Sequence, residues 1–451
     1  MNYMTKRLRE VIVTPYLLLF TLLMLPVSVS AQLTLDSCQA MAQANYPLIK
    51  KCDMISRMKE YTLSNISKGW LPQITATLQA TLQNNVSNMP SQLTSMTTQS
   101  GINYKGMGKA QYKVGVDVSQ TIWEGGRINA ALKVEQARIE VEQAQINTDM
   151  YGIRKRVNDL FFGILLTDER LKVNADLQTL LHSDIDKLES MVKNGVAMQS
   201  DVDEIQAELM SAKQSATELQ AARKQYANML GLLCGTDKIQ TSTLDFDDYG
   251  ISKNINAQGL ECNKDSIYAQ NRPELALINK NIQLTYLQEK QLKSGLMPIL
   301  SIFAQGFYGY PGYDSFEAMM KRDLTWNGMI GAKLTWNIGN LYTNKNDKKK
   351  LQIQRKYNEN QREVFLFNNK LDQTESREQI ERYKKLSMED DDIVSLRKNV
   401  RIATEKKLAH GIINSNDLIQ QIIKENNARN DKIIHQIQML SEIYDLKYII
   451  N

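Results

Sequence analysis

The clearest pattern of polar and apolar positions begins at Lys113 and continues to Trp123. Over these residues valine or isoleucine alternates with charged, polar or glycine residues, and this period of two predicts a β-strand with one apolar face. After a turn at 124–126, residues 127–193 contain no proline. A helix over that range would be roughly 100 Å long at 1.5 Å per residue. Because globular helices average about three turns, such a helix does not belong in a compact domain.

Two shorter helices are predicted before this strand. Thr34 occupies an N-cap position for a helix that continues to about Ala44. Pro47, which is tolerated in the first turn of a helix, begins a second helix that extends toward Lys68. The chain therefore enters the strand region from a helical segment.

A second strand is predicted at about 73–83. There, Ile, Ala and Leu alternate with Thr and Gln, so one face is apolar and the other polar. The following residues, 84–111, are rich in Ser, Asn, Gln, Thr and Gly and have no helical period. This composition predicts a long exposed loop between the two strands.

The long helix is expected to turn back on itself at Gly195, since glycine is preferred just past a helix end. Ser200 or Gln199 is expected to begin a returning helix that continues to about residue 230, with Ser200 the better N-cap. Its apolar positions have the three-four spacing of a heptad seam, which predicts an antiparallel coiled-coil hairpin over 127–230. These positions are Val202, Ile205, Leu209, Ala212, Ala216 and Leu219.

The whole pattern then occurs a second time. Proline, glycine and aspartate at key points of the first half recur in the second half at a displacement of more than about 200 residues, which indicates a duplicated domain rather than a solenoid. The corresponding pairs are Pro47 and Pro273, Pro72 and Pro298, Gly195 and Gly411, and Asp201 and Asp417.

The second copy predicts the same elements in the same order. Strands are expected at about 299–310 and 328–336, with a loop between them, and a helical hairpin at 341–449. The domain division that follows is a first repeat at 32–235, an irregular segment at 236–270 and a second repeat at 271–451, after an N-terminal segment at 1–31.

The N-terminal segment has the order of a secretory signal peptide. Three basic residues precede an apolar run at 11–25, and Val29-Ser30-Ala31 fits a small-residue cleavage site. An uncleaved anchor is the alternative. A lipoprotein is disfavoured, because Asp36 lies shortly before Cys38, the first thiol downstream. No other apolar stretch reaches the length of a transmembrane helix.

Charge and chemistry exclude several functions. A formal net charge of +5 is too small for a nucleic-acid-binding protein of 451 residues. Three histidines and four cysteines show no metal-ligand spacing, and neither a catalytic triad nor a phosphate-binding loop is present, so no cofactor is expected. Cys234 and Cys262 are candidates for a disulfide in an oxidising compartment; unpaired thiols are the alternative.

Four amphipathic strands cannot close a barrel by themselves, and in lipid every strand edge has to be paired. The smallest closed barrels have about eight strands. A symmetric oligomer supplies the missing strands, and a trimer would provide twelve. The expected fold is therefore an α+β membrane protein in which a shared barrel continues into a tube of long helices.

In this order of elements the chain resembles the TolC family of outer-membrane efflux proteins. The resemblance covers nearly the whole chain after the N-terminal segment. It is carried by the duplicated helix–strand–strand–helix order, by the start of the second repeat, by the strand-to-helix joint and by the two helix tips. These motifs are Arg272-Pro273-Glu274-Leu275, Trp123-Glu124-Gly125-Gly126-Arg127, Gly195 with Asp201, and Gly411 with Asp417.

The resemblance implies a homotrimer with a 12-stranded outer-membrane barrel and a helical tunnel that extends into the periplasm of a Gram-negative cell. It further implies docking to a periplasmic adaptor protein and an inner-membrane pump, which deliver drugs, metals or proteins for export. The pump would select the substrate.

The candidate site residues fall into four groups. Adaptor docking is assigned to the helix tips at Asn194, Gly195, Asp201, His410, Gly411 and Asp417. A gate or constriction is assigned to Glu405, Lys406, Asp391 and Asp392. The barrel lumen is assigned by strand parity to Lys113, Asp117, Gln305 and Lys333, although Phe303 and Phe307 interrupt the polar face of the third strand. The strand-to-helix joints are assigned to Gly125, Gly126 and Gly339.

The acidic run and the four tryptophans can each be interpreted in two ways. Family members often have acidic rings at the periplasmic mouth, whereas here Glu405 is followed by Lys406 and Lys407. The acidic run at 389–392 is either a constriction or a solvated helix face. The four tryptophans at strand ends, Trp70, Trp123, Trp326 and Trp336, either form interfacial girdles or pack in the ordinary way.

Three other classes of protein compete with a channel. A periplasmic adaptor would carry one helical hairpin between compact β-domains, and a structural coiled-coil rod would leave the alternating strands unexplained. An enzyme is disfavoured by the absence of a catalytic set.

Overall fold

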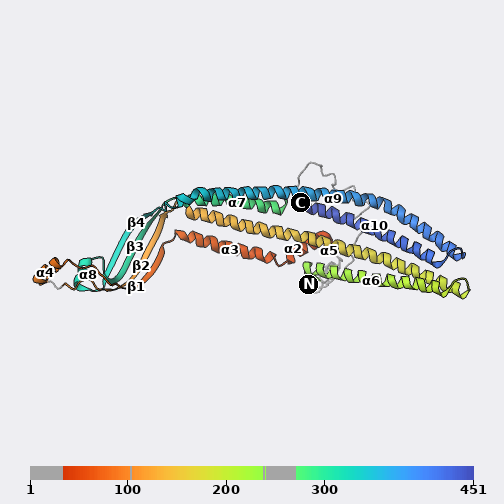
Figure 1. The fold of residues 1–451 in the computed structure, drawn as a ribbon, viewed down its shortest axis with the longest axis horizontal. Helices are drawn as coiled ribbons and strands as arrows, with labels where there is room; N and C mark the ends of the chain where they lie inside the picture. Colours follow the sequence, from red (N-terminus) through yellow and green to blue (C-terminus); the bar gives the residue numbers. More distant parts are fainter. Residues whose placement is uncertain (1–33, 102–103, 237–238, 240–270, 451) are drawn as a thin grey trace, which may run out of the picture.

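A computed structural model describes residues 34–101, 104–236, 239 and 271–450. The predicted signal peptide, Cys262 and nearly all of the predicted irregular segment 236–270 lie outside the described residues. The chain forms a long rod with a small sheet at one end and helices that extend away from it (Figure 1).

The first repeat begins with two helices that lead into a pair of strands and ends with a helical hairpin. Thr34 caps the first helix as predicted, since its hydroxyl accepts a hydrogen bond from the Ser37 amide at 3.3 Å. The elements are α2 (Leu35–Asn45), α3 (Ile49–Ser67), the short 3-10 helix η1 (Lys68–Trp70), β1 (Gln73–Leu82), α4 (Ser91–Gln99), β2 (Ala110–Trp123), α5 (Arg127–Lys193) and α6 (Gln199–Cys234).

The second repeat follows the same order with one N-terminal helix. Pro273 is its first residue, a position where the missing amide hydrogen of proline costs nothing. The elements are α7 (Pro273–Ser294), β3 (Ile299–Tyr310), α8 (Ser315–Lys321), β4 (Thr325–Thr335), α9 (Asn340–Ala409) and α10 (Ser415–Ile450).

The four strands form one antiparallel sheet in the order β1-β2-β3-β4. The two strands of each repeat pair with each other, and β2 of the first repeat pairs with β3 of the second. Within the described residues, β1 and β4 each have one unpaired edge. Each edge strand continues into its own side of the rod: β1 follows α3, and β4 leads into α9 (Figure 1).

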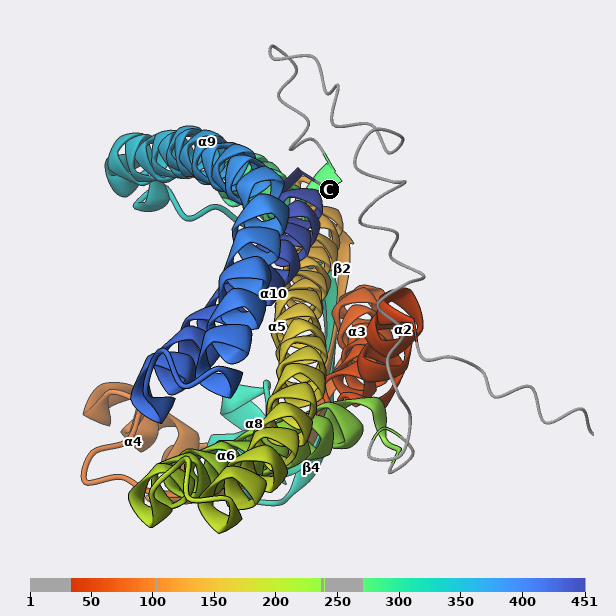
Figure 2. The same cartoon turned by 90° about the vertical axis from the view of Figure 1, so that its right-hand side faces the viewer.

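Helix α5 is the central element of the rod and contacts α2, α3, α6, α7 and α10. Figure 2, viewed along the rod, shows α5 between α10 on one side and α3 on the other. One buried apolar cluster lies around the middle of α5 and includes Phe161, Ile164 and Leu165. A second lies nearer the tips, where four of the predicted seam residues, Val202, Ile205, Leu209 and Ala212, are buried against α5.

Several predictions about local structure were wrong. The range 84–111 is not all loop, because it contains α4, and the loop after β3 contains α8. The two helices have only 9 and 7 residues, which is shorter than the window over which a helical period can be recognised. Of the two predicted starts of the returning helix, Gln199 is right and Ser200 is not the N-cap. Helix α6 begins at Gln199 with Met198 as the cap, whose amide donates to the Asp201 carboxylate at 2.9 Å.

The two strand-to-helix joints differ in backbone conformation. Gly125 and Gly126 have φ of 65° and 79°, a left-handed conformation that glycine adopts without strain. Gly339, by contrast, has an ordinary right-handed helical φ of −57°. The first joint therefore requires glycine for its backbone, and the second does not.

Replacing Gly126 with alanine should lower the stability of the protein by about 1–2 kcal/mol, the cost of a left-handed L-residue. A Cβ at this position would meet no atom within 4 Å, so the penalty is conformational. Gly125→Ala should cost more, because its Cβ would lie 2.2 Å from Cβ of Met297. Thermal unfolding in detergent, followed by far-ultraviolet circular dichroism, measures both.

Gly152→Ala is the matched control. Gly152 lies within α5 with open space around its Cβ position, so alanine there should be neutral or stabilise by roughly 0.5–1 kcal/mol. Equal melting temperatures for the Gly126 and Gly152 variants would contradict the role given to the joint.

Candidate functional site

The sheet has one polar and one apolar face, and the four predicted lumen residues lie on the polar face. Asp117 is paired with Thr75 and with Gln305. Lys333 is paired with Ser301, four residues before Gln305 on the same strand. Directly paired residues share a face, and side chains alternate between faces, so Lys113, Asp117, Gln305 and Lys333 all belong to one face.

The opposite face is apolar and open in the single chain. Leu78 and Ile330 are 81% and 79% exposed. An apolar surface of this extent on one face of a sheet marks an interaction with lipid or protein. Its exposed members are Ile74, Leu78, Leu82, Val114, Val116, Ile302, Tyr308, Trp326, Ile330 and Leu334.

The two phenylalanines on the polar face are accommodated by glycines on neighbouring strands. Phe303 lies opposite Gly331, and Phe307 lies opposite Gly115. A Cβ on either glycine would come within 2.8 Å of the facing phenylalanine. The ring of Phe307 is buried between Tyr313 and the ammonium group of Lys113, so it does not interrupt the polar surface.

The four tryptophans are exposed near the two ends of the sheet. Trp70, Trp123 and Trp336 lie at the end that joins the helices, and the Trp336 indole donates to the Leu296 carbonyl at 3.0 Å. Trp326 lies at the other end, near α8, beside the ring of Tyr308 at 5.3 Å. This distribution matches the aromatic girdles that flank a lipid-facing band.

At the far end of the rod, the two helical hairpins end in similar tips. Gly195 and Gly411 have φ of 71° and 68° and terminate α5 and α9, as predicted. Asn194 and His410 are the C-cap residues of these helices. Asp201 joins the two tips, because it accepts a hydrogen bond from the Ser415 hydroxyl at 2.6 Å. Asp417 instead has its amide bound by the Asn414 side chain at 3.0 Å.

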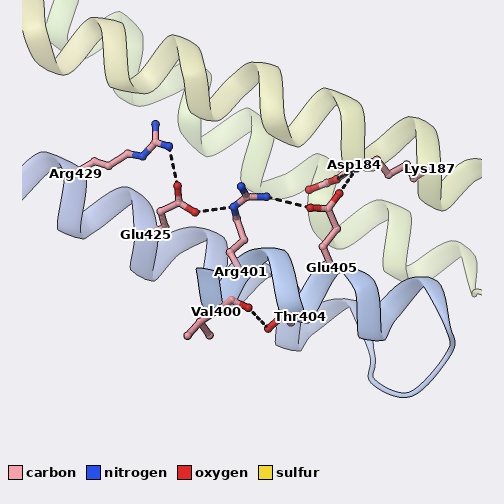
Figure 3. Close-up of polar contacts among 8 residues, drawn as sticks. All are labelled: Asp184, Lys187, Val400, Arg401, Thr404, Glu405, Glu425 and Arg429. Carbon is pink, nitrogen blue, oxygen red and sulfur yellow. Dashed lines mark hydrogen bonds and ion pairs between the residues drawn. The ribbon is translucent and has the colours of Figure 1, made fainter. Parts of the chain in front are cut away.

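A chain of charges runs between the hairpins just above the tips (Figure 3). Lys187 on α5 pairs with Glu405 on α9 and lies 2.9 Å from Asp184. The Glu405 carboxylate also binds Arg401 at 3.1 Å, and Arg401 binds the buried Glu425 of α10 at 2.6 Å. The predicted gate residue Glu405, with a side chain that is 29% exposed, therefore binds Lys187 of α5 and, through Arg401, is linked to α10.

Burial and hydrogen bonds shift the pKa values of Asp184 and Lys187. Burial raises the pKa of Asp184, while the hydrogen bond and the charge of Lys187 lower it only in part. Burial opposes the charge of Lys187, but hydrogen bonds to Glu405 and Asp184 outweigh this effect and raise its pKa. Lys187 is therefore held protonated by the two carboxylates that it joins.

The other predicted gate residues are placed differently. Lys406 is exposed. In the acidic run, Asp391 pairs with Lys432 of α10 and Asp392 is exposed. Asp390 is buried and lies 2.9 Å from the His435 ring nitrogen. Two of the four acidic residues, Asp390 and Asp391, therefore bind side chains of α10, so the run is not simply a solvated helix face.

Sequence reasoning did not find Lys187, Arg401 or Glu425. Lys187 and Glu405 are 218 residues apart in the sequence, so no local pattern connects them. It also missed the exposed apolar residues of the tips, Val196, Met198 and Ile412, which are 62%, 73% and 69% exposed. An apolar residue directly after each tip glycine was the available signal.

Within the described residues, no helix combines the length and apolar character needed to cross a membrane. No cluster of three or more metal-ligating side chains occurs in that part of the chain either.

Two comparisons with known proteins agree with this geometry. Residues 41–236 match the family model described as outer membrane efflux protein, which spans most of the first repeat. No curated protein sequence is similar enough to match the chain.

Solved structures share the fold over 92% of this chain at low sequence identity. The open state of the MtrE outer membrane channel of Neisseria gonorrhoeae matches with a TM-score of 0.68 at 14% identity, over 88% of its own chain. The outer membrane protein VceC of Vibrio cholerae matches with a TM-score of 0.65 at 12% identity, over 95% of its chain. The outer-membrane channel OprN gives a TM-score of 0.67 at 12% identity, over 89% of its chain.

The chain therefore has the fold of outer-membrane channels of known structure. The chain is thus similar to the outer membrane efflux protein family over residues 41–236.

Proposed function

We propose that this chain is the outer-membrane exit duct of a tripartite efflux or type I secretion system and that it acts as a homotrimer. The observation that carries the proposal is the two-faced sheet with an open edge on β1 and on β4. A lipid-facing sheet cannot leave backbone groups unpaired, so the β4 edge of one copy pairs with the β1 edge of the next. Three copies close a 12-stranded barrel.

The helices next to the two sheet edges support the same ring. On the β4 side, α9 carries an outward apolar stripe, which consists of Ile353, Tyr357, Val364, Phe367, Leu371, Ile393, Leu396 and Val400, all exposed. On the β1 side, α3 exposes Met54, Met58 and Tyr61. Because the two apolar surfaces lie on opposite flanks of one chain, they form a head-to-tail interface between copies, which closes into a ring.

In the trimer the polar face of the sheet lines the barrel. Lys113, Asp117, Gln305 and Lys333 then face water in the lumen, while the apolar face and its flanking tryptophans contact lipid. The helical tube continues this passage into the periplasm of a Gram-negative cell. The joints at Gly125, Gly126 and Gly339 are the points where barrel becomes tube.

The tips are the proposed contact with a periplasmic adaptor and, through it or directly, an inner-membrane pump. Exposed Val196, Met198 and Ile412 supply apolar anchors at the end of the tube. Polar Asn194, His410 and Asp417 surround them, an arrangement typical of protein interfaces. Asp201 and Ser415 hold the two tips in register, so that both hairpins present their ends together.

We propose that the charge chain of Lys187 and Glu405 keeps the periplasmic end narrow. It ties the α5–α6 hairpin to the α9–α10 hairpin just above the tips, where separation of the hairpins would widen the tube. Asp391 and Asp392 lie farther up α9, and we propose Asp392 as the member of the acidic run that remains free to face the passage.

The barrel orientation is tested by charge reversal on each face of the sheet. Asp117→Lys should leave membrane insertion intact and shift ion selectivity toward anions severalfold, because three copies change the lumen together. Leu78→Lys is the control on the apolar face, where a charge at mid-membrane depth costs about 2–4 kcal/mol and should reduce insertion. Reversal potentials in planar bilayers and membrane fractionation measure the two effects. Unchanged selectivity with Asp117→Lys would reverse the assignment of faces.

The trimer is tested on the α9 stripe. Phe367→Glu places a charge in the proposed interface and should convert trimers to monomers, read by light scattering in detergent. Lys370→Glu introduces the same carboxylate at an exposed position beside the stripe and should leave trimers intact. Equal trimer content in both variants would exclude this stripe as the interface.

The gate is tested by neutralising Glu405. Glu405→Gln removes the charge that binds Lys187 and Arg401, so the hairpins separate more readily and single-channel conductance should rise severalfold. Lys187→Met should do the same from α5. Lys406→Gln, at the exposed next position, should leave the conductance unchanged. Wild-type conductance in both network variants would exclude a gating role.

A further inference from the structure

Two cysteines that are distant in sequence face each other inside the rod. Cys38 on α2 and Cys234 at the end of α6 are separated by 196 residues. Cys38 is fully buried, and Cys234 is 6% exposed. The Cys234 thiol donates to the Cys38 carbonyl oxygen at 3.5 Å.

Neighbouring contacts fix the two helices in this register. The Asn45 side chain at the end of α2 donates to the carbonyl oxygens of Leu232 and Leu233, at 3.2 and 3.1 Å. Gly235 terminates α6 with φ of 71°, and a Cβ there would lie 2.7 Å from the Asn45 side chain. The approach of the sulfur atoms is therefore set by the packing of α2 on α6 and not by the thiols alone.

The two thiols are chemically unequal. The hydrogen bond to Cys234 and burial raise the pKa of Cys38, whereas the same hydrogen bond lowers the pKa of Cys234. Cys52 on α3, only half-buried, is free as well but lies outside this pair.

We propose that Cys38 and Cys234 are joined by a disulfide bond in the exported protein. The proposal rests on the outer-membrane location in the proposed function, because disulfides persist in oxidising compartments. It replaces the sequence-based pairing of Cys234 with Cys262. A disulfide would also occupy the Cys38 sulfur, which excludes a thioether-linked lipid on that residue.

The oxidant is the disulfide of a thiol–disulfide oxidase of the cell envelope. The thiolate of one cysteine attacks this disulfide, which forms a mixed disulfide and releases one oxidase thiolate. The thiolate of the other cysteine then attacks the substrate sulfur of the mixed disulfide and releases the second oxidase thiolate. Two protons leave the chain, and the oxidase disulfide becomes a dithiol. Because both sulfur atoms are buried in the folded chain, the exchange takes place before α2 packs on α6.

Such a bond closes the first repeat covalently. It links the first described helix of the chain to the end of the first hairpin, directly before the segment that leads to the second repeat. The link lies in the apolar cluster at the middle of α5, where α2, α6 and α10 meet. It would thereby restrain the middle of the rod, away from both the sheet and the helix tips.

The bond is tested on full-length protein isolated from the outer-membrane fraction. The protein is denatured without reductant, blocked with N-ethylmaleimide, digested and mapped by mass spectrometry. The expected result is a linked peptide pair containing Cys38 and Cys234, about 2 Da lighter than the two reduced peptides together. Cys52 should carry the maleimide.

Two variants serve as controls. Cys262→Ser should retain the linked pair, and Cys38→Ser should leave Cys234 blocked by maleimide. Maleimide on both Cys38 and Cys234 of the wild type, or a peptide linking Cys234 to Cys262, would overturn the inference.

Channel measurements separate this result from the proposed function. Free Cys38 and Cys234 in a protein that fractionates with the outer membrane and conducts ions would overturn the disulfide alone. Free thiols in a protein recovered from the soluble fraction would overturn the disulfide and the location together.

Discussion

The pairing of backbone groups in lipid is the constraint on which the rest of the structure depends. A four-stranded sheet with one apolar face and two open edges cannot stand alone in hydrocarbon, because each unpaired amide or carbonyl costs several kcal/mol there. In the proposed trimer, further copies pair those edges. The rotation that pairs β4 of one copy with β1 of the next also brings the α9 flank of the first against the α3 flank of the second, so the barrel and the helical tube would close together.

The two ends of the rod are held by different interactions. At the sheet, backbone hydrogen bonds and cross-strand packing fix the register, with Gly115 and Gly331 making room for Phe307 and Phe303. At the tips, charged side chains connect the hairpins, and the central carboxylates Asp184 and Glu425 are buried. Ionic contacts of this kind break when one partner is neutralised, whereas backbone pairing does not. The tip is therefore the end at which a change of partner or protonation can alter the shape of the tube.

Features that depend on neighbouring residues in the sequence were predicted, whereas contacts between distant residues were not. Helix α5 was predicted over its full length at residues 127–193, because a long run without proline between glycines is a local pattern. Strand parity placed Lys113, Asp117, Gln305 and Lys333 on one face for the same reason. The pairing of Lys187 with Glu405 and of Cys38 with Cys234 left no local trace, since each joins residues about 200 positions apart. Helices α4 and α8 were missed because, at 9 and 7 residues, they are too short for a helical period to be recognised.

Helix α9 has the reverse of the usual amphipathic pattern. Its buried positions are mostly polar: Asn369 donates to the Ile449 carbonyl at 2.8 Å, and Gln373 binds Asn369 at 2.6 Å. Its apolar stripe points away from the protomer, with Phe367 64% exposed. An ordinary surface helix buries its apolar side and exposes its polar side. An exposed apolar surface of that length favours association, which agrees with the proposed trimer. In that trimer, the polar positions of α9 bond to its own chain, and its apolar positions contact the neighbouring copy.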